Sequence, residues 1–359
     1  MAISHLIAGG APYYLGPGLL RSVGTIAGRW SNARFPVIVT SPAVERLFGD
    51  RVSKSFGGKA ARLLMDDREA NKSFETVDRL VGELLSIGAR RDTVIVALGG
   101  GVIGDTAGFA ASIFMRGVDL IHVPTTLLAQ VDSSIGGKVA VNHARGKNLV
   151  GSFYRPRAIV ADLETLATLG RRDLVSGLYE IVKAGVIADR SLFEMLESAP
   201  DALLAGHPAA LEPAIRLAAG IKGRVVEADE REGGLRRVLN YGHTIGHGIE
   251  AALDYEGISH GEAVAWGMIG ANAIAVRRGM LEEALRQRID ALILAYEPGR
   301  PPVMERGRVL AAITHDKKFV VERRVMVLPG EIGRAEIIED ITDDEIAFGV
   351  DVALERMAQ

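Results

Sequence analysis

Histidines gather in one short segment of the sequence, with carboxylates at helical spacing. His243, His247 and Glu250 stand at i, i+4 and i+7, which places them on one face of a helix. His260 follows at the start of another expected helix. Two or three imidazoles, one carboxylate and an open coordination position are what a catalytic zinc site needs. The carboxylate could be Glu250 or, from an earlier helix, Glu180, and spacing alone does not choose between them.

A glycine-rich turn indicates a second kind of site. The three glycines that match G-x-G-x-x-G are Gly99, Gly101 and Gly104. They follow a β-rich run and precede a helical pattern, so backbone N–H groups and the positive end of a helix dipole could hold a pyrophosphate. The usual acidic partner of the ribose is misplaced, because Asp119 opens the next strand instead of closing it. We therefore expect the ribose to be held from elsewhere, with Glu69 in the loop 67–72 as the candidate; the alternative is a solvated charged loop.

Cations and amides form a third group. The stretch 130–153 is polar, punctuated by glycine and too long for a simple connector, and such loops are often functional. Its candidates are Asp132, Lys138, Asn142, Lys147 and Asn148, and Lys222, Arg236 and Asn240 precede the histidine segment. Several cations around a metal favour a substrate with two anionic groups, since arginine binds carboxylate or phosphate in a bidentate manner. Each cation taken singly is more often a surface charge.

Strands and helices alternate in the first half of the chain, which must position these residues. Strand-like runs at 36–40, 61–65, 93–98, 120–123 and 158–162 are separated by helical patterns, such as 73–87. This alternation predicts a parallel, doubly wound α/β sheet. From Gly170 onward the pattern is mostly helical. We therefore expect a Rossmann-like, nucleotide-binding α/β domain over residues 1–169 and a mainly α-helical, metal- and substrate-binding domain over residues 170–359.

The composition excludes several classes of protein. With 48% hydrophobic residues, 24% charged residues and a net charge of −3, the chain is typical of a globular protein without a nucleic-acid footprint. It has no cysteine, so any metal must be held by histidine and carboxylate. The N-terminus lacks a secretory signal pattern, and the apolar stretch 263–276 is too short to span a bilayer. These features predict a cytoplasmic protein that binds neither nucleic acid nor membrane.

Seven segments together resemble one enzyme family. They are GGGVIGDTAGFAA, RGVDLIHVPTTLLAQVDSSIGGK, GKNLVGSFYRP, GLYEIVKAG, EADEREGGLRRVLNYGHTIGHGIE, SHGEAVAWGM and HDKK, in that order along the chain. The chain thereby resembles the sugar-phosphate cyclases and, within them, most closely the 3-dehydroquinate synthases, over residues from about 67 to 333. The glycine turn alone is a weak signal, but the whole series is highly specific.

The resemblance implies an NAD- and metal-dependent lyase of the shikimate pathway of aromatic amino acid biosynthesis. The implied reaction converts 3-deoxy-D-arabino-heptulosonate 7-phosphate to 3-dehydroquinate and phosphate. It proceeds by transient NAD oxidation, phosphate β-elimination, reduction and intramolecular aldol closure. The implied metal is Zn²⁺ or Co²⁺, held by Glu180, His243 and His260. In this assignment His247 contacts the substrate and Glu250 is structural.

The resemblance also assigns the remaining contacts. The implied NAD contacts are Asp67, Arg68, Glu69, Ala70, Asn71, Lys72, Gly100, Gly101, Val102, Ile103, Gly104, Asp105, Thr125, Thr126, Lys138, Lys147, Thr165, Leu166, Ala167 and Thr168. The implied substrate contacts are Asp132, Lys138, Asn148, Lys183, Lys222, Arg236, Asn240, His247 and one of Lys317 and Lys318. Arg116 occupies a place that reaches the phosphate pocket of a neighbouring subunit in such enzymes, which implies a homodimer. Val139 departs from the family pattern, which has threonine there, and this puts one local hydrogen bond in doubt.

Three rival functions are weighed against this one. Sister cyclases accept sedoheptulose 7-phosphate, which has no carboxylate, whereas Arg236 and Asn240 favour an acidic substrate. A metal-dependent polyol dehydrogenase of related fold would have little use for so many anion-binding cations. A catalytically silent NAD-binding regulator would have a broken metal triad, but Glu180, His243 and His260 are all present.

Overall fold

The computed structural model describes residues 5–301, 304–317 and 325–359, without the side chains of residues 315–317. The chain divides into two compact units. Unit 1 comprises residues 1–169 and 222–231, and unit 2 comprises residues 170–221 and 232–359. The segment 222–231 therefore belongs with the N-terminal part of the chain, although it follows the first three helices of unit 2 in the sequence.

Unit 1 is built on a seven-stranded sheet of order β1-β2-β9-β6-β5-β3-β4. The strands are β1 (Leu6–Ala8), β2 (Ala11–Gly16), β3 (Phe35–Thr40), β4 (Ala61–Leu64), β5 (Thr93–Gly99), β6 (Asp119–Pro124) and β9 (Ala158–Asp162). All pairings are parallel except that of β1 with β2. The predicted parallel α/β sheet is confirmed.

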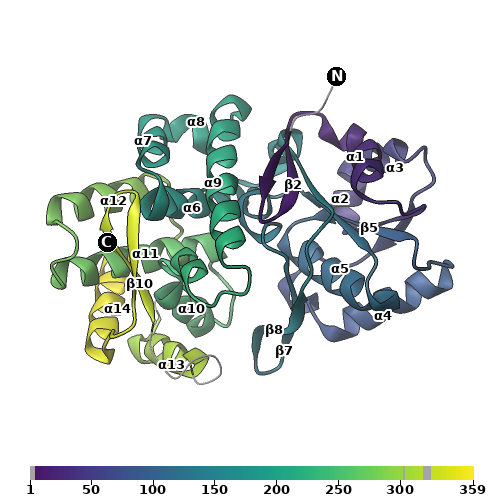
Figure 1. Ribbon diagram of the computed structural model, residues 1–359. Helices are drawn as coiled ribbons and strands as arrows, with labels where there is room; N and C mark the ends of the chain where they lie inside the picture. The colour runs from purple at the N-terminus through teal and green to yellow at the C-terminus, as the bar shows by residue number, and fades with distance from the viewer. Residues whose placement is uncertain (1–4, 302–303, 318–324) are drawn as a thin grey trace. The chain divides into compact units, whose positions relative to one another are not determined.

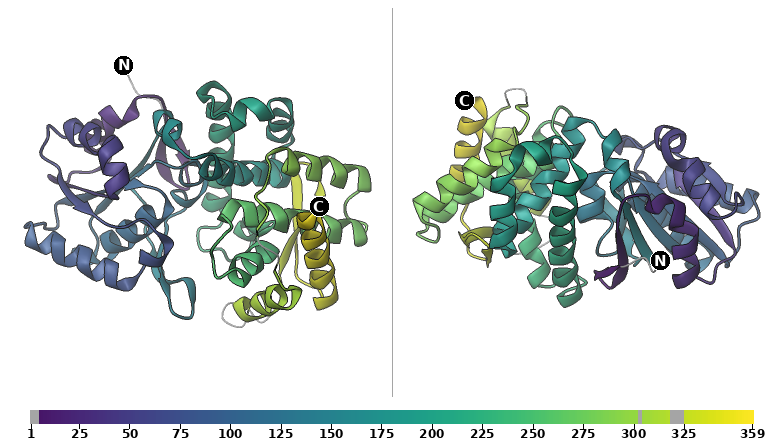
Figure 2. Two further views of the ribbon diagram at one scale, coloured as in Figure 1. Left: turned by 180° about the vertical axis from the view of Figure 1, so that it is seen from behind. Right: turned by 90° about the horizontal axis from the view of Figure 1, so that it is seen from above.

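Helices cover both faces of this sheet (Figures 1 and 2). They are α1 (Val23–Trp30), α2 (Pro42–Val44), α3 (Asp50–Ser55), α4 (Phe74–Ser86) and α5 (Gly101–Ile113). Strand β5 is buried along its whole length, and its side chains alternate between two cores. Ile95 and Ala97 pack with α4 and α5, whereas Val94 and Val96 pack with α1 and α3. This explains why β5 is an uninterrupted apolar run, as parallel strands buried on both faces are.

A two-stranded hairpin stands apart from the sheet. Its strands are β7 (Lys138–His143) and β8 (Gly146–Phe153), which pair in antiparallel. Val139 and Val141 point into the core beneath α5, while the alternate residues are partly or fully exposed. The hairpin holds most of the stretch that the sequence suggested as a functional loop.

Unit 2 is mainly helical, as predicted. Its helices are α6 (Arg171–Ala188), α7 (Arg190–Ser198), α8 (Pro200–Leu204), the first part of α9 (Pro208–Ala228), α10 (His243–Ala252), α11 (His260–Arg277), α12 (Glu283–Ala295), α13 (Arg306–Lys317) and α14 (Asp343–Ala358). Unit 2 also contains one antiparallel hairpin of β10 (Met326–Glu331) with β11 (Arg334–Ile338). Helix α11 is buried nearly all round, begins with a capping box of Ser259 and Glu262, and packs against α6, α10, α12 and α14.

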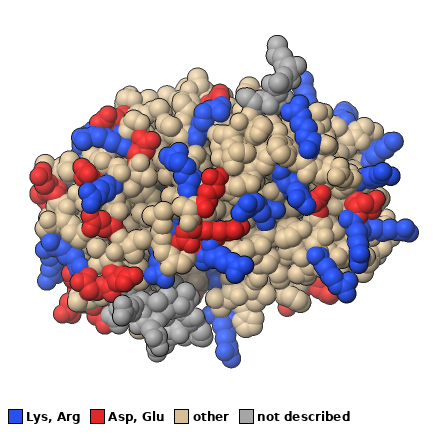
Figure 3. Space-filling model, viewed as in Figure 1, with Lys and Arg blue, Asp and Glu red and all other residues tan. Residues whose placement is uncertain are grey.

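The described residues form neither a membrane-spanning helix nor, on the face drawn in Figure 3, a single basic patch. No helix within the described ranges has the length and apolar character needed to cross a bilayer. On the face drawn in Figure 3, Lys and Arg side chains alternate with Asp and Glu and do not merge into one basic patch. This mixture matches the near-neutral net charge of −3.

Candidate functional site

The three histidines come together in unit 2 because two helices begin close to one another. His243 opens α10 and His260 opens α11. A Cβ atom on Gly267 of α11 would overlap the carbonyl oxygen of Gly242, so glycine allows the two backbones to touch. One ring nitrogen each of His243, His247 and His260 lies within 4.8 Å of the others, which is close enough for a shared ion.

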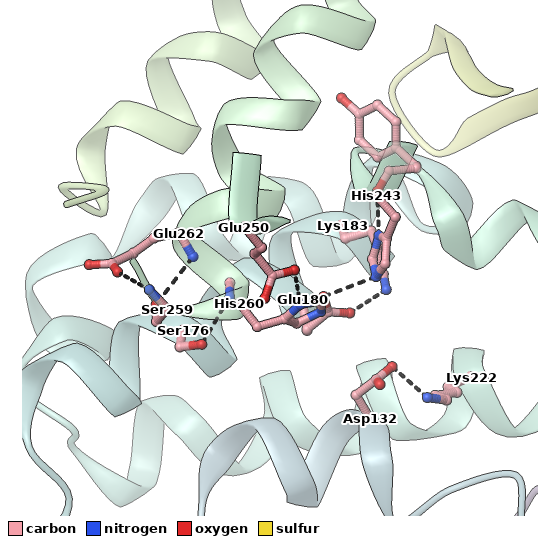
Figure 4. Close-up of polar contacts among 12 residues, drawn as sticks. Asp132, Ser176, Glu180, Lys183, Lys222, His243, Glu250, Ser259, His260 and Glu262 are labelled. Atoms are coloured by element: carbon pink, nitrogen blue, oxygen red, sulfur yellow. Dashed lines mark hydrogen bonds and ion pairs between the residues drawn. The ribbon is translucent and has the colours of Figure 1, made fainter. Parts of the chain in front are cut away.

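Glu180 supplies a carboxylate to this cluster from α6 (Figure 4). Its Oε1 atom lies 3.8 Å from Nε2 of His243 and 3.7 Å from Nε2 of His260. Both distances exceed a hydrogen bond. Glu180 is only 3% exposed, its Oε2 atom pairs with Lys183, and within the described part of the chain its Oε1 atom has no hydrogen-bond donor. A buried carboxylate oxygen beside two imidazole nitrogens, with a gap between them, fits a bound divalent cation such as zinc or cobalt.

The electrostatics of the cluster favour metal binding. Burial, followed by the nearby charges of Lys183, His247 and His260, holds the pKa of His243 well below its ordinary value of 6.5. His243 is therefore neutral at pH 7, and a neutral imidazole is the form that binds metal. Lys183 lies one helical turn from Glu180, forms an ion pair with it and is itself buried. This pair compensates part of the cost of burying the Glu180 carboxylate.

Both candidate histidine ligands are anchored through their other nitrogen. Nδ1 of His243 lies 3.1 Å from the carbonyl oxygen of Tyr241. Nδ1 of His260 lies 3.1 Å from Oε2 of Glu250. Glu180 thus faces the Nε2 atoms, whereas Glu250 contacts the opposite side of one ring. The sequence left these two carboxylates as alternatives, and their different contacts are what spacing could not reveal.

The glycine turn in unit 1 lies at the carboxyl end of β5. Gly100 is the N-cap of α5, and a Cβ on Gly101 would lie 3.2 Å from the Ser133 hydroxyl. Gly99, Gly100, Gly104, His122 and Ser133 line a small depression there. The backbone is thus free of side chains where a helix begins, the arrangement that accepts a phosphate.

A buried lysine connects the glycine turn to the hairpin. Lys72 is 5% exposed, and its Nζ atom lies 2.5 Å from both Asp105 Oδ2 and Asn148 Oδ1. Burial raises the pKa of Asp105, and Lys72 opposes that rise. Asn142 donates to Glu69 Oε1 at 2.8 Å. Residues from the loop 67–72, from α5 and from the hairpin, which the sequence assigned to cofactor and substrate, are therefore neighbours.

Other predicted residues of unit 1 have separate places. Lys222 donates to Asp132 Oδ1 at 2.5 Å. Thr165 is buried in a short helix, Leu163–Thr168, and accepts from Gln130. Thr125 is buried, and Thr126 accepts from the Ala129 N–H.

Lys138 is exposed at the start of β7, and Lys147 lies 4.0 Å from Glu69. Arg116 ends a turn with φ of 70°.

The remaining predicted residues belong to unit 2. Arg236 is buried in a short helix, Leu235–Asn240, and Asn240 donates to Glu232 at 3.1 Å. The pairing of Asn240 with Glu232 was not predicted from the sequence. Glu232 also has a positive φ of 60°, which is uncommon for a side-chain-bearing residue. Lys317 ends α13, but its side chain lies outside the described residues, as does Lys318. The structure thus brings together the predicted metal ligands in unit 2, and residues of the loop 67–72, of α5 and of the hairpin in unit 1.

Comparisons with known proteins agree with this geometry. Residues 62–176 match the family model of the 3-dehydroquinate synthase N-terminal region, and residues 177–319 match that of its C-terminal region. A 3-dehydroquinate synthase of Pelotomaculum thermopropionicum is 45% identical over 333 residues, covering 91% of this chain and 89% of the relative. Another, of Desulforamulus reducens, is 42% identical over 342 residues, covering 93% and 95%.

Solved structures of similar fold carry the cofactors that the site would fit. A 2-deoxy-scyllo-inosose synthase in complex with carbaglucose-6-phosphate, NAD⁺ and Co²⁺ is 31% identical, covers 96% of both chains and has a TM-score of 0.87. A 2-epi-5-epi-valiolone synthase from Streptomyces hygroscopicus subsp. jinggangensis 5008, with NAD⁺ and Zn²⁺ bound, is 30% identical, covers 99% of this chain and 100% of the other, and has a TM-score of 0.87. From the two family models and the curated relatives together, this chain belongs to the 3-dehydroquinate synthase family.

Proposed function

We propose that this chain converts 3-deoxy-D-arabino-heptulosonate 7-phosphate to 3-dehydroquinate and phosphate, with NAD and a divalent metal ion. The observation that carries the proposal is the buried Glu180 oxygen that lies 3.8 and 3.7 Å from two histidine nitrogens. A silent binding protein has no need of an intact ligand set of this kind. The identity of 42–45% to curated 3-dehydroquinate synthases supports this choice of substrate.

In this proposal Glu180, His243 and His260 hold Zn²⁺ or Co²⁺. When bound, the metal acidifies a substrate hydroxyl and NAD reversibly accepts a hydride. His247 is exposed beside the cluster, and in this assignment it contacts the substrate and not the metal. Lys183, paired with Glu180, would balance the charge of the ligand set and contact the substrate.

NAD binds to unit 1 in this proposal. The turn that Gly100 and Gly101 form at the start of α5 would hold the pyrophosphate through its backbone N–H groups, and the loop 67–72 would hold the ribose. The remaining NAD contacts are those that the family resemblance implies. Lys72, which already joins Asp105 to Asn148, holds the two sides of this site in register.

The anionic groups of the substrate are divided between two sets of residues. Lys138, Asn148, Asn240 and His247 hold the phosphate until it leaves, and the phosphate's own oxygen takes the neighbouring carbon-bound proton. Arg236 and Lys222 pair with the carboxylate, with Asp132 orienting the Lys222 ammonium. Return of the hydride to the substrate before ring closure would leave no net NADH. We also propose a cytoplasmic homodimer in which Arg116 reaches the partner's phosphate site.

The sister cyclases are the nearest alternative. They would lack a substrate carboxylate, so the buried guanidinium of Arg236 would have no anionic partner on the substrate. The test is to supply the metal-loaded protein with either 3-deoxy-D-arabino-heptulosonate 7-phosphate or sedoheptulose 7-phosphate and to measure phosphate release and dehydroquinate. We expect dehydroquinate and phosphate in equal amounts from the first substrate. Turnover of sedoheptulose 7-phosphate alone would overturn the proposal.

Two variants sharpen the substrate assignment. Arg236→Ala should raise KM for the acidic substrate strongly while leaving metal content unchanged. Arg237→Ala is the matched control, because Arg237 is the adjacent arginine and lies 3.9 Å from Glu339 in a loose surface pair. Equal loss of zinc and of affinity in the Arg236 variant would contradict the assignment of Arg236 to the carboxylate.

A further inference from the structure

A second carboxylate, Glu250, lies behind the candidate metal ligands. It belongs to α10, one turn beyond His247, and is 7% exposed. Its backbone carbonyl accepts from the N–H groups of Leu253 and Tyr255 at the end of the helix, which fixes the main chain at this position. Its side chain contacts Nδ1 of His260 at 3.1 Å, across to the start of α11.

The contacts of the Glu250 carboxylate differ from those of Glu180, the proposed metal ligand. A neutral imidazole has one nitrogen that donates and one with a free lone pair. If Nδ1 of His260 donates its proton to Glu250, the lone pair is on Nε2, the atom that lies 3.7 Å from Oε1 of Glu180. The two carboxylates therefore contact opposite edges of the same ring. Glu250 shares a helical face with His243 and His247, but its Oε2 atom contacts Nδ1 of His260, whereas Glu180 faces Nε2 of the same ring.

His260 has more need of such an anchor than His243. The side chain of His260 is 31% exposed, whereas that of His243 is 14% exposed. His243 has a backbone carbonyl, that of Tyr241, at 3.1 Å from Nδ1. A carboxylate in the equivalent place holds the ring more firmly and makes the opposite nitrogen a better donor to a metal.

We propose that Glu250 is a positioning residue of the metal centre. It accepts the Nδ1 proton of His260, selects the tautomer with a free Nε2 and fixes the rotation of the ring. This inference rests on the proposed function only in requiring a metal at Glu180, His243 and His260. The experiments that test it measure metal binding and the tautomer of the His260 ring, and they do not depend on enzyme turnover.

The variants are Glu250→Gln and Glu250→Ala, with Glu262→Gln as the matched control. The amide oxygen of glutamine can still accept from Nδ1, whereas alanine removes the acceptor. Glu262 is an equally buried carboxylate near the same helix start, but it pairs with Arg172 and accepts from the Ser259 N–H. All four proteins are titrated with Co²⁺, following the visible absorption of the bound ion, and their thermal unfolding is measured without metal.

We expect Glu250→Ala to weaken Co²⁺ binding about 10- to 100-fold and to alter the absorption spectrum. Glu250→Gln should stay within a few-fold of the wild type, and Glu262→Gln should bind normally even if its melting temperature falls. A folded Glu250→Ala protein with wild-type affinity and spectrum would overturn the inference. So would equal weakening in all three variants, which would indicate a general loss of packing.

A measurement on the unsubstituted protein covers the case in which the alanine variant does not fold. Long-range proton–nitrogen NMR of the histidine rings, in the metal-free protein above pH 7, distinguishes the two tautomers. We expect His260 to carry its proton on Nδ1, and a proton on Nε2 would overturn the inference. Failure of the wild-type protein to bind Co²⁺ at all would instead count against the proposed metal centre.

Discussion

Replacing Gly267 with alanine should damage the metal centre from outside it. Gly267 lies where α11 crosses the start of α10, and a Cβ there would overlap the Gly242 carbonyl oxygen and lie 2.8 Å from the Gly246 nitrogen. Both distances fall short of the 3.4 Å at which ordinary contact begins, so the helices must separate by more than the about 0.6 Å that the Gly246 nitrogen alone requires. These are backbone atoms, and no rotamer change relieves the clash. Metal sites tolerate errors of only about 0.2 Å in ligand distances.

We therefore expect Gly267→Ala to weaken Co²⁺ binding at least about tenfold and to lower the free energy of unfolding by about 1–3 kcal/mol. The assays are Co²⁺ titration and urea denaturation of the metal-free protein. Gly307→Ala is the control, because Gly307 lies in α13 with open space around its Cβ position. It should be slightly stabilised and bind metal normally. Wild-type affinity and stability in Gly267→Ala would refute the claim that this contact sets the distance between His243 and His260.

Three further predictions concern pH and metal. Burial lowers the pKa of His122 to about 4, below its ordinary 6.5. The neutral side chain therefore contributes fully to the free energy of unfolding above pH 6.5, and this contribution is lost as pH falls toward 4. His122→Gln should remove about 2 kcal/mol of the decrease in the free energy of unfolding that urea melts detect between pH 7 and pH 5. Hydrogen bonds from Arg278 lower the pKa of Glu345 to about 2, so their contribution is present above pH 4.5 and is lost as pH falls to 2. Glu345→Gln should therefore cost about 1–3 kcal/mol at pH 7 and little at pH 2, again by urea melts. Removal of metal with a chelator should abolish phosphate release and lower the melting temperature. Adding Zn²⁺ back at a hundred times its Kd should raise the free energy of unfolding by about 2.7 kcal/mol.

Five of the seven strands in the sheet of unit 1 could be predicted, because each is a short apolar run with turn residues on either side, whereas β1 and β2 were missed. Residues 93–98 became β5, and the glycines after it became the start of α5, as expected. The β7–β8 hairpin was missed as a pair of strands. Its alternating Val139 and Val141 carry the period of a strand, but glycines and charges around them favoured a loop.

The candidate metal site was only partly predictable from residue types. Helical spacing put His243, His247 and Glu250 on one face, and this much follows from local geometry. Which nitrogen each carboxylate faces depends on the crossing of α10 with α11 and on the approach of α6, which are long-range contacts. Glu180 is far from His243 in the sequence, so its choice as a ligand came from family resemblance. The anchoring of His260 by Glu250 became visible only in three dimensions.

The stoichiometry of NAD tests the central claim most directly. Metal-loaded protein is given 3-deoxy-D-arabino-heptulosonate 7-phosphate and far less NAD than substrate, and dehydroquinate, phosphate and the absorbance of NADH are followed together. We expect all the substrate to become dehydroquinate and phosphate in equal amounts, with no net NADH. Arrest after one turnover per NAD, with NADH accumulating, would contradict it and indicate a dehydrogenase.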